Sequence, residues 1–144
     1  MKILFDTNII VDVLLDRKPF AQPASFLLSK VERSEAIGFL CATTITTIHY
    51  LVAKATNKNE AIKNIQVLLS LFEIAPVNRL VLENALNSRF ADFEDAVLHE
   101  AACHVGAEYI VTRDISGFKE SRVPVYTPGE FINMLKSLEN KEGC

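Results

Sequence analysis

Four aspartates in this sequence are placed so that they could act together on a charged ligand. Asp6 directly follows the apolar run Ile3-Leu4-Phe5, and Asp114 closely follows the apolar run at 109–112. Asp92 and Asp95 are three residues apart, so they share one face if the segment is helical. Carboxylates that lie together repel one another unless a cation neutralises them. Mg²⁺ and Mn²⁺ prefer carboxylate and water ligands, and two such ions about 4 Å apart can activate water against a phosphodiester.

Each acid also has an ordinary structural explanation. Asp and Thr are good N-caps, so Asp6 or Thr7 could serve only to begin the next helix. Asp92 could cap its own helix, and acids in a first turn complement the helix dipole. The recurrence of acids on separate elements favours a shared metal site over capping alone.

Apolar runs predict the strands that position these acids. Segments 3–5, 37–41, 72–75 and 109–112 are largely apolar without alternation, and 125–126 is a further short candidate. Such runs are typical of strands covered on both faces of a parallel sheet. An acid at the end of a buried strand marks the edge of the sheet, where α/β proteins bind ligands.

Helical periodicity fills the intervals between the strands. It predicts helices over 9–15, 20–31, 44–55, 61–72, 79–86, 92–105 and 128–135. Asn78 is a plausible N-cap, Gly106 suits a helix end, and Thr127-Pro128-Gly129-Glu130 has the pattern of a capping box with proline in the first turn. Alternating strands and helices predict an α/β fold with a parallel sheet of four to five strands and helices on both sides.

Length and composition predict one compact domain. The chain has 144 residues, of which 49% are hydrophobic, and we expect a domain at 1–138 with a disordered tail at 139–144. No stretch approaches the roughly 20 apolar residues of a membrane span, and no signal peptide pattern is seen, so a soluble cytoplasmic protein without a membrane partner is expected. The three cysteines show no metal or disulfide spacing and predict free thiols.

The net charge of −3 argues against a broad basic surface for nucleic acid. Most of the excess acid lies in the second half of the chain, where Asp92, Asp95 and Asp114 are found. An acidic cluster that binds divalent cations could still accept a polyanion through those ions.

Three motifs follow one another in a specific order: Ile3-Leu4-Phe5-Asp6-Thr7-Asn8, then Asp95-Ala96-Val97 with Ala101-Ala102, then the segment 109–114 that ends in Thr112-Arg113-Asp114. With the closing segment 125–131, this order resembles the PIN-domain nucleases, including the VapC-type toxins of bacterial toxin–antitoxin pairs. The resemblance implies a PIN-like three-layer α/β/α sandwich and a Mg²⁺- or Mn²⁺-dependent endoribonuclease. It also implies an RNA substrate, a homodimer, a possible antitoxin partner, and Asp6, Asp95 and Asp114 as the catalytic, metal-binding acids.

The chain departs from that family pattern at one position. The family has a glutamate in the helix after the second strand, whereas here His49 stands at the expected place and no Asp or Glu occurs between Glu35 and Glu60. Asp92 or Glu94 could supply the fourth carboxylate, the site could bind one metal weakly, or catalysis could be lost. The alternative function is therefore a catalytically weak or inactive PIN-like domain that binds RNA or a protein. A phospho-acceptor receiver domain would need paired acids after the first strand, which are absent.

Five further residues are weaker candidates for substrate contacts. Asn8, Thr46, His49, Thr112 and Arg113 could bind waters or RNA phosphates near the predicted edge. Capping, local backbone bonding and solvated charge are the ordinary explanations for the same residues. His99, one turn after Asp95 on the same face, could support a metal ligand, but a position on the helix surface is expected.

Overall fold

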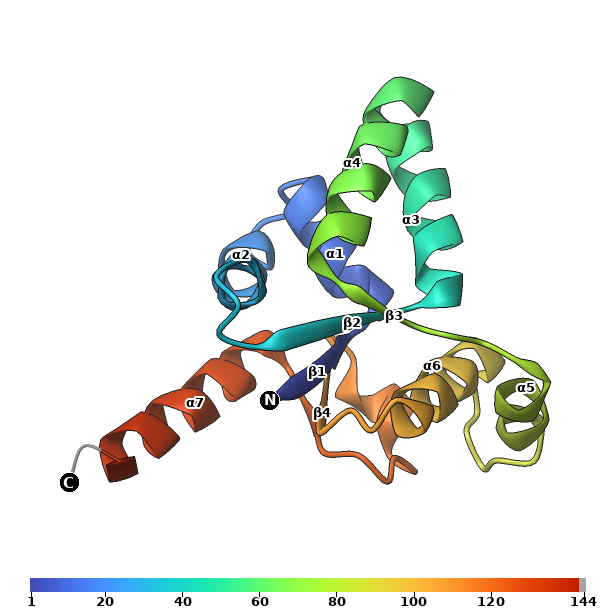
Figure 1. Ribbon diagram of the computed structural model, residues 1–144, viewed down its shortest axis with the longest axis vertical. Helices are drawn as coiled ribbons and strands as arrows, with labels where there is room; N and C mark the ends of the chain where they lie inside the picture. Colours follow the sequence, from blue (N-terminus) through green and yellow to red (C-terminus); the bar gives the residue numbers. More distant parts are fainter. Residues whose placement is uncertain (143–144) are drawn as a thin grey trace.

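A computed structural model describes residues 1–142, which form a five-stranded parallel sheet between two layers of helices (Figure 1). The strands are β1 (Lys2–Phe5), β2 (Ile37–Cys41), β3 (Glu73–Ala75), β4 (Tyr109–Val111) and β5 (Val125–Tyr126), in the spatial order β3-β2-β1-β4-β5. The helices are α1 (Thr7–Leu14), α2 (Ala21–Glu32), α3 (Ala42–Ala55), α4 (Lys58–Leu71), α5 (Arg79–Leu86), α6 (Phe93–His104), the 3₁₀ helix η1 (Ile115–Phe118) and α7 (Pro128–Glu142). The predicted fold class is confirmed.

The central strand β1 contributes to two separate hydrophobic cores. Ile3 and Phe5 point into a core shared with α1, α2, α3, α4 and α7. Leu4 points to the opposite face, where α5, α6 and η1 supply the second core. Figure 1 shows α1 to α4 on one side of the sheet and α5 and α6 on the other. Because successive strand residues face opposite sides, β1 must be apolar at each of these positions.

The parallel register brings the ends of β1 and β4 together. Phe5 is the partner of Val111, and the Asp6 amide donates a hydrogen bond to the Val111 carbonyl at 2.9 Å. The residues that follow the two strands, Asp6 and Thr112, therefore leave the sheet side by side.

Helix ends follow the local signals in the sequence. The side chain of Asn78 accepts a hydrogen bond from the Val81 amide at 3.0 Å, and Gly106 after α6 has a φ of 70°. Thr127 and Glu130 form the predicted capping box, with reciprocal hydrogen bonds of 3.0 and 3.2 Å. These predicted helix ends are confirmed.

Two segments of the chain are more helical than the sequence predicts. Residues 115–118, where no helix is predicted, form η1, and α7 continues to Glu142, past the expected domain end at residue 138. Residues 143–144 of the expected tail lie outside the described residues. Cys41 and Cys103 are free thiols as predicted, and Cys144 is outside the described part. No helix in residues 1–142 is long and apolar enough to cross a membrane.

Gly38 is the position in β2 where a side chain is excluded by packing. A Cβ atom there would lie 2.7 Å from the Phe72 ring and 2.9 Å from Val31 Cγ2. We expect Gly38→Ala to lower the free energy of unfolding by about 1–3 kcal/mol through overpacking. Chemical denaturation measures this loss. Gly129→Ala is the control, because nothing lies within 4 Å of its added Cβ and alanine favours a helix. Equal stability of the Gly38→Ala variant and the native chain would contradict the packing described.

Candidate active site at the carboxyl edge of the sheet

Three of the predicted acids come together at this edge from three different elements. Asp6 follows β1, Asp114 follows β4, and Asp95 lies in the first turn of α6. The Thr112 hydroxyl joins two of them, since it donates to Asp6 Oδ2 at 2.8 Å and accepts from the Asp114 amide at 3.2 Å. The Thr7 amide donates to Asp6 Oδ1 at 2.7 Å, so Asp6 caps α1 and also faces the site.

Gly117 in η1 allows Asp95 to approach Asp114. A Cβ atom on Gly117 would lie 2.7 Å from Asp95 Oδ2 and 3.9 Å from Asp114 Oδ2, so both carboxylates face the same point. The Ser116 hydroxyl donates to Asp114 Oδ1 and holds that side chain. Sequence reasoning missed Ser116 and Gly117, although the Ser-Gly pair that begins five residues after the end of β4 is a turn signal.

Burial and mutual repulsion raise the pKa of two site acids. Burial raises the pKa of Asp95 from 3.8 to about 7, with further contributions from the charges of Asp6, Asp92, Glu94 and Asp114. Burial also raises the pKa of Asp6, whereas the hydrogen bonds from Thr112 and Thr7 oppose that rise. Within residues 1–142 no Lys or Arg forms an ion pair with Asp6, Asp95 or Asp114. The site therefore concentrates negative charge without a basic partner, which is the condition that a divalent cation relieves.

The weaker candidates take different positions around these acids. Asn8 contacts Asp6 Oδ2 at 3.5 Å and accepts from the Arg113 amide at 3.3 Å. Thr46 is exposed and donates to the Thr43 carbonyl at 2.9 Å, a bond within its own helix. Asp92 is exposed and caps α6 by accepting from the Asp95 amide at 2.9 Å. The structure thus brings Asn8 to the acids, gives Thr46 a local partner, and makes Asp92 both a cap and a nearby charge.

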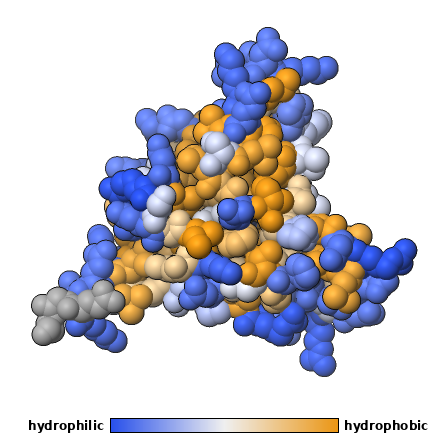
Figure 2. Space-filling model, in the orientation of Figure 1, coloured by the Kyte–Doolittle hydropathy of each residue, from blue (hydrophilic) through white to orange (hydrophobic). Residues whose placement is uncertain are grey.

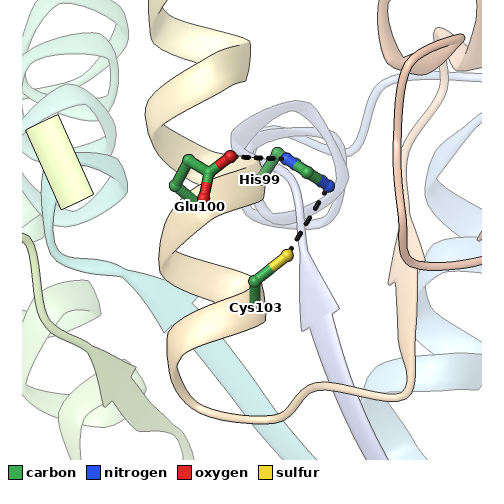
Figure 3. A group of neighbouring side chains, drawn as sticks. All are labelled: His99, Glu100 and Cys103. Atoms are coloured by element: carbon green, nitrogen blue, oxygen red, sulfur yellow. Dashed lines mark hydrogen bonds and ion pairs between the residues drawn. The ribbon is translucent and has the colours of Figure 1, made fainter. Parts of the chain in front are cut away.

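A second group of potential metal ligands lies farther along α6 (Figure 3). His99, Glu100 and Cys103 place one ligating atom each within 4.8 Å of one another, the only such trio among residues 1–142. Arg122 already contacts the potential ligand atoms of this group. Its amide donates a hydrogen bond to His99 Nε2 at 3.0 Å, and its guanidinium lies 3.1 Å from Glu100 Oε2. Phe90 stacks on the imidazole with centroids 4.7 Å apart. The group therefore fastens the loop after Asp114 to α6.

The burial of His99 corrects a sequence expectation. Its side chain is fully buried, so the expected surface position was wrong. Desolvation lowers the pKa of the imidazole, and the Arg122 amide requires an unprotonated Nε2. This neutral ring, placed against Phe90, belongs to the packing that supports the site.

The relationship to known proteins agrees with this geometry. A family model described as the PIN domain matches residues 2–116. This chain belongs to the PIN-domain family. Ribonuclease VapC1 of Aquifex aeolicus is 26% identical over 143 residues, covering 95% of this chain and 97% of that protein.

Two solved structures share the fold of this PIN domain. The VapC20 toxin of Mycobacterium tuberculosis, described as cleaving the sarcin-ricin loop, superposes with a TM-score of 0.67 at 13% identity, over 82% of this chain and 94% of that chain. A toxin–antitoxin complex from Klebsiella pneumoniae gives a TM-score of 0.67 at 23% identity, over 87% of this chain and 96% of that chain. At these identities the likeness concerns the fold.

Helix α3 of this PIN domain reaches the site through Thr44. Thr44 is buried, and its hydroxyl lies 2.9 Å from that of Thr7, next to Asp6. His49 lies more than one turn farther along α3, and no hydrogen bond or ion pair within residues 1–142 joins it to the site acids. Sequence reasoning missed Thr44, because a single threonine in a threonine-rich helix start gives no distinguishing signal.

Removing the charge of Asp95 is expected to stabilise the metal-free PIN domain above pH 7. The folded state holds the Asp95 proton more tightly than the unfolded chain, so ionising this group costs stability above a pH of about 7. That cost disappears as the pH falls toward 4, where both states are protonated. In thermal unfolding with EDTA, the melting temperature of Asp95→Asn should therefore exceed that of the native protein at high pH. At low pH the two melting temperatures should be equal.

Asp16→Asn is the matched control for this comparison. Asp16 is exposed and has a φ of 48°, a conformation that asparagine accepts. A stabilisation by Asp95→Asn that did not change with pH, or one that Asp16→Asn reproduced, would contradict the electrostatic account.

Proposed function

We propose that this PIN domain is a Mg²⁺- or Mn²⁺-dependent endoribonuclease that hydrolyses RNA phosphodiester bonds, and that it acts as the toxin of a toxin–antitoxin pair. The observation that carries the proposal is the convergence of Asp6, Asp95 and Asp114, none of which has an ion-pair partner among the described residues. Divalent ions at such carboxylates supply a nucleophilic water and stabilise charge on the phosphate and the leaving oxygen. The ribonuclease name of the Aquifex aeolicus relative supports the same activity.

The chain's own residues have distinct parts in this proposal. Asp6, Asp95 and Asp114 offer hard oxygen ligands from three elements. Their carboxylates are spread more widely than a trio within 4.8 Å, which suits two ions or one ion with several waters. Thr112 and Ser116 act as positioning residues, because their hydroxyls fix the orientation of Asp6 and Asp114.

A protein partner is proposed for the exposed apolar surface. Figure 2 shows apolar surface over α4, where Ile62, Val67, Leu69 and Leu71 are exposed. Helix α5 also exposes Leu80, Leu82 and Leu86. Apolar patches of this kind mark protein interfaces. We assign them to a homodimer contact and an antitoxin, in line with the toxin–antitoxin complex that shares this fold.

One observation favours a second function, a PIN domain that binds RNA or protein without cutting it. The α3 residue that hydrogen-bonds to Thr7, beside Asp6, is Thr44, a hydroxyl in the region where the family carries a glutamate. A hydroxyl carries no charge and binds a hard cation less strongly than a carboxylate does. This alternative predicts RNA binding without turnover.

Cleavage of RNA with Mn²⁺ tests the proposed activity. Native protein should cut a mixed RNA substrate in Mn²⁺ and leave it intact in EDTA. Asp6→Asn and Asp95→Asn should each slow cleavage at least about 100-fold, since loss of a direct ligand should exceed the roughly 10- to 100-fold loss that follows removal of a group supporting a ligand. Single-turnover rates on denaturing gels measure the effect.

The controls separate catalysis from contamination and misfolding. Asp16→Asn, which changes an exposed aspartate outside the site, should cleave at the native rate. Cleavage by the native protein that persisted unchanged in Asp95→Asn would show that the activity does not come from this site. Binding of RNA with no metal-dependent cleavage would establish the non-cutting alternative.

A further inference from the structure

A small apolar pocket lies directly beside the acidic site. It has a volume of about 200 Å³, below the roughly 300–1,000 Å³ of sites for larger ligands. Pro19, Phe20 and Pro23 line it from the start of α2, and Thr127 to Gly129 line it from the start of α7. Arg113 completes the wall, and it immediately precedes Asp114. The pocket can hold one ring system next to the proposed catalytic acids.

Arg113 is held rigidly in this wall. Its Nε lies 2.9 Å from Asp12 Oδ2, an ion pair whose angles are not those of a hydrogen bond, and Asp12 is fully buried in α1. Its guanidinium carbon lies 4.2 Å from the centroid of the Phe20 ring. The Arg113 amide also donates to Asn8, which contacts Asp6. Two contacts, with Asp12 and with the Phe20 ring, therefore position the guanidinium, and the bond from Asn8 holds the Arg113 backbone near Asp6.

Both planar groups remain accessible to a ligand. The Phe20 residue is 39% exposed and the Arg113 side chain 31% exposed. Such planes are what single-stranded RNA-binding proteins offer to unstacked bases, since bases stack on aromatic rings and on guanidinium groups. Arg17 lies 3.9 Å from Asp12 and, with its neighbour Lys18, adds positive charge on this side of the site.

We propose that this pocket, the Phe20–Arg113 pocket, binds one nucleobase of single-stranded RNA at the same edge of the sheet as Asp114. This inference rests on the proposed function, which identifies RNA as the ligand. It adds a position at which the protein binds the substrate strand. Arg113, Arg17 and Lys18 outnumber the neighbouring acids Asp12 and Asp16, and this excess of positive charge favours a polyanion as the occupant. Because Arg113 directly precedes Asp114, the pocket lies at the same edge of the sheet as the proposed catalytic acids. The domain therefore selects unpaired RNA, because a base in a duplex cannot enter the pocket.

The test compares Phe20→Ala with Phe26→Ala, a change of a similarly exposed phenylalanine in α2 that does not line the pocket. Fluorescence anisotropy measures binding of one labelled single-stranded RNA of about eight nucleotides, a length typical of single-stranded sites. The buffer contains Ca²⁺, and a gel verifies that the RNA stays intact. Loss of one stacked base should weaken binding of Phe20→Ala roughly 5- to 150-fold, while Phe26→Ala binds as the native protein does.

Abasic substitution in the RNA identifies the base. Each nucleotide is replaced in turn by an abasic residue. At one position the abasic RNA should bind the native protein as weakly as the intact RNA binds Phe20→Ala. The same abasic RNA and the intact RNA should bind the Phe20→Ala variant with equal affinity. Phe20→Leu, which keeps the apolar volume and loses the aromatic face, should behave like Phe20→Ala and guards against misfolding of the smaller variant.

The outcomes separate this inference from the proposed activity. Phe20-dependent, base-dependent binding without cleavage would support the pocket and contradict the nuclease. Metal-dependent cleavage with equal RNA affinity for Phe20→Ala and Phe26→Ala would support the nuclease and overturn the pocket. Unchanged RNA binding combined with weaker binding of a protein encoded beside this chain would assign the pocket to a protein partner and also overturn the inference.

Discussion

Repulsion among closely placed carboxylates at the end of a parallel sheet is the constraint on which this structure depends. Asp6 and Asp95 are partly buried and Asp114 is exposed, and within residues 1–142 no Lys or Arg forms an ion pair with any of the three. Burial and the neighbouring acids raise the pKa of Asp95 to about 7, so ionising this carboxylate is costly in the folded protein. Repulsion within such a cluster lowers the free energy of unfolding, and a bound divalent cation would remove this repulsion.

The surrounding structure keeps these acids close in spite of their repulsion. The central position of β1 places Asp6 beside the end of β4, and Thr112 ties Asp6 to Asp114. Arg122 fastens the loop that follows Asp114 onto α6, through the amide bond to His99 and the ion pair with Glu100. Because α6 also carries Asp95, this network fixes the distance between the last two acids.

The sequence predicted what depends on neighbouring residues and missed what depends on distant ones. The five strands, the cap at Asn78 and the box at Thr127 follow from local pattern and backbone chemistry, and all are present. The acids of the candidate site were predictable because strand ends in a parallel sheet share an edge. The packing of Gly117 against Asp95, and the pairing of Asp12 with Arg113, join residues far apart in sequence and leave no local signal.

Binding of Mn²⁺ near pH 7 tests the central claim most directly. Isothermal titration calorimetry in two buffers of different ionisation enthalpy should give saturable binding at one or two sites with release of protons, because a cation must displace the proton that Asp95 holds at a pKa of about 7. The Asp95→Asn variant should bind more weakly and release fewer protons. Absence of saturable binding, or equal affinity and proton release in the two proteins, would contradict the account.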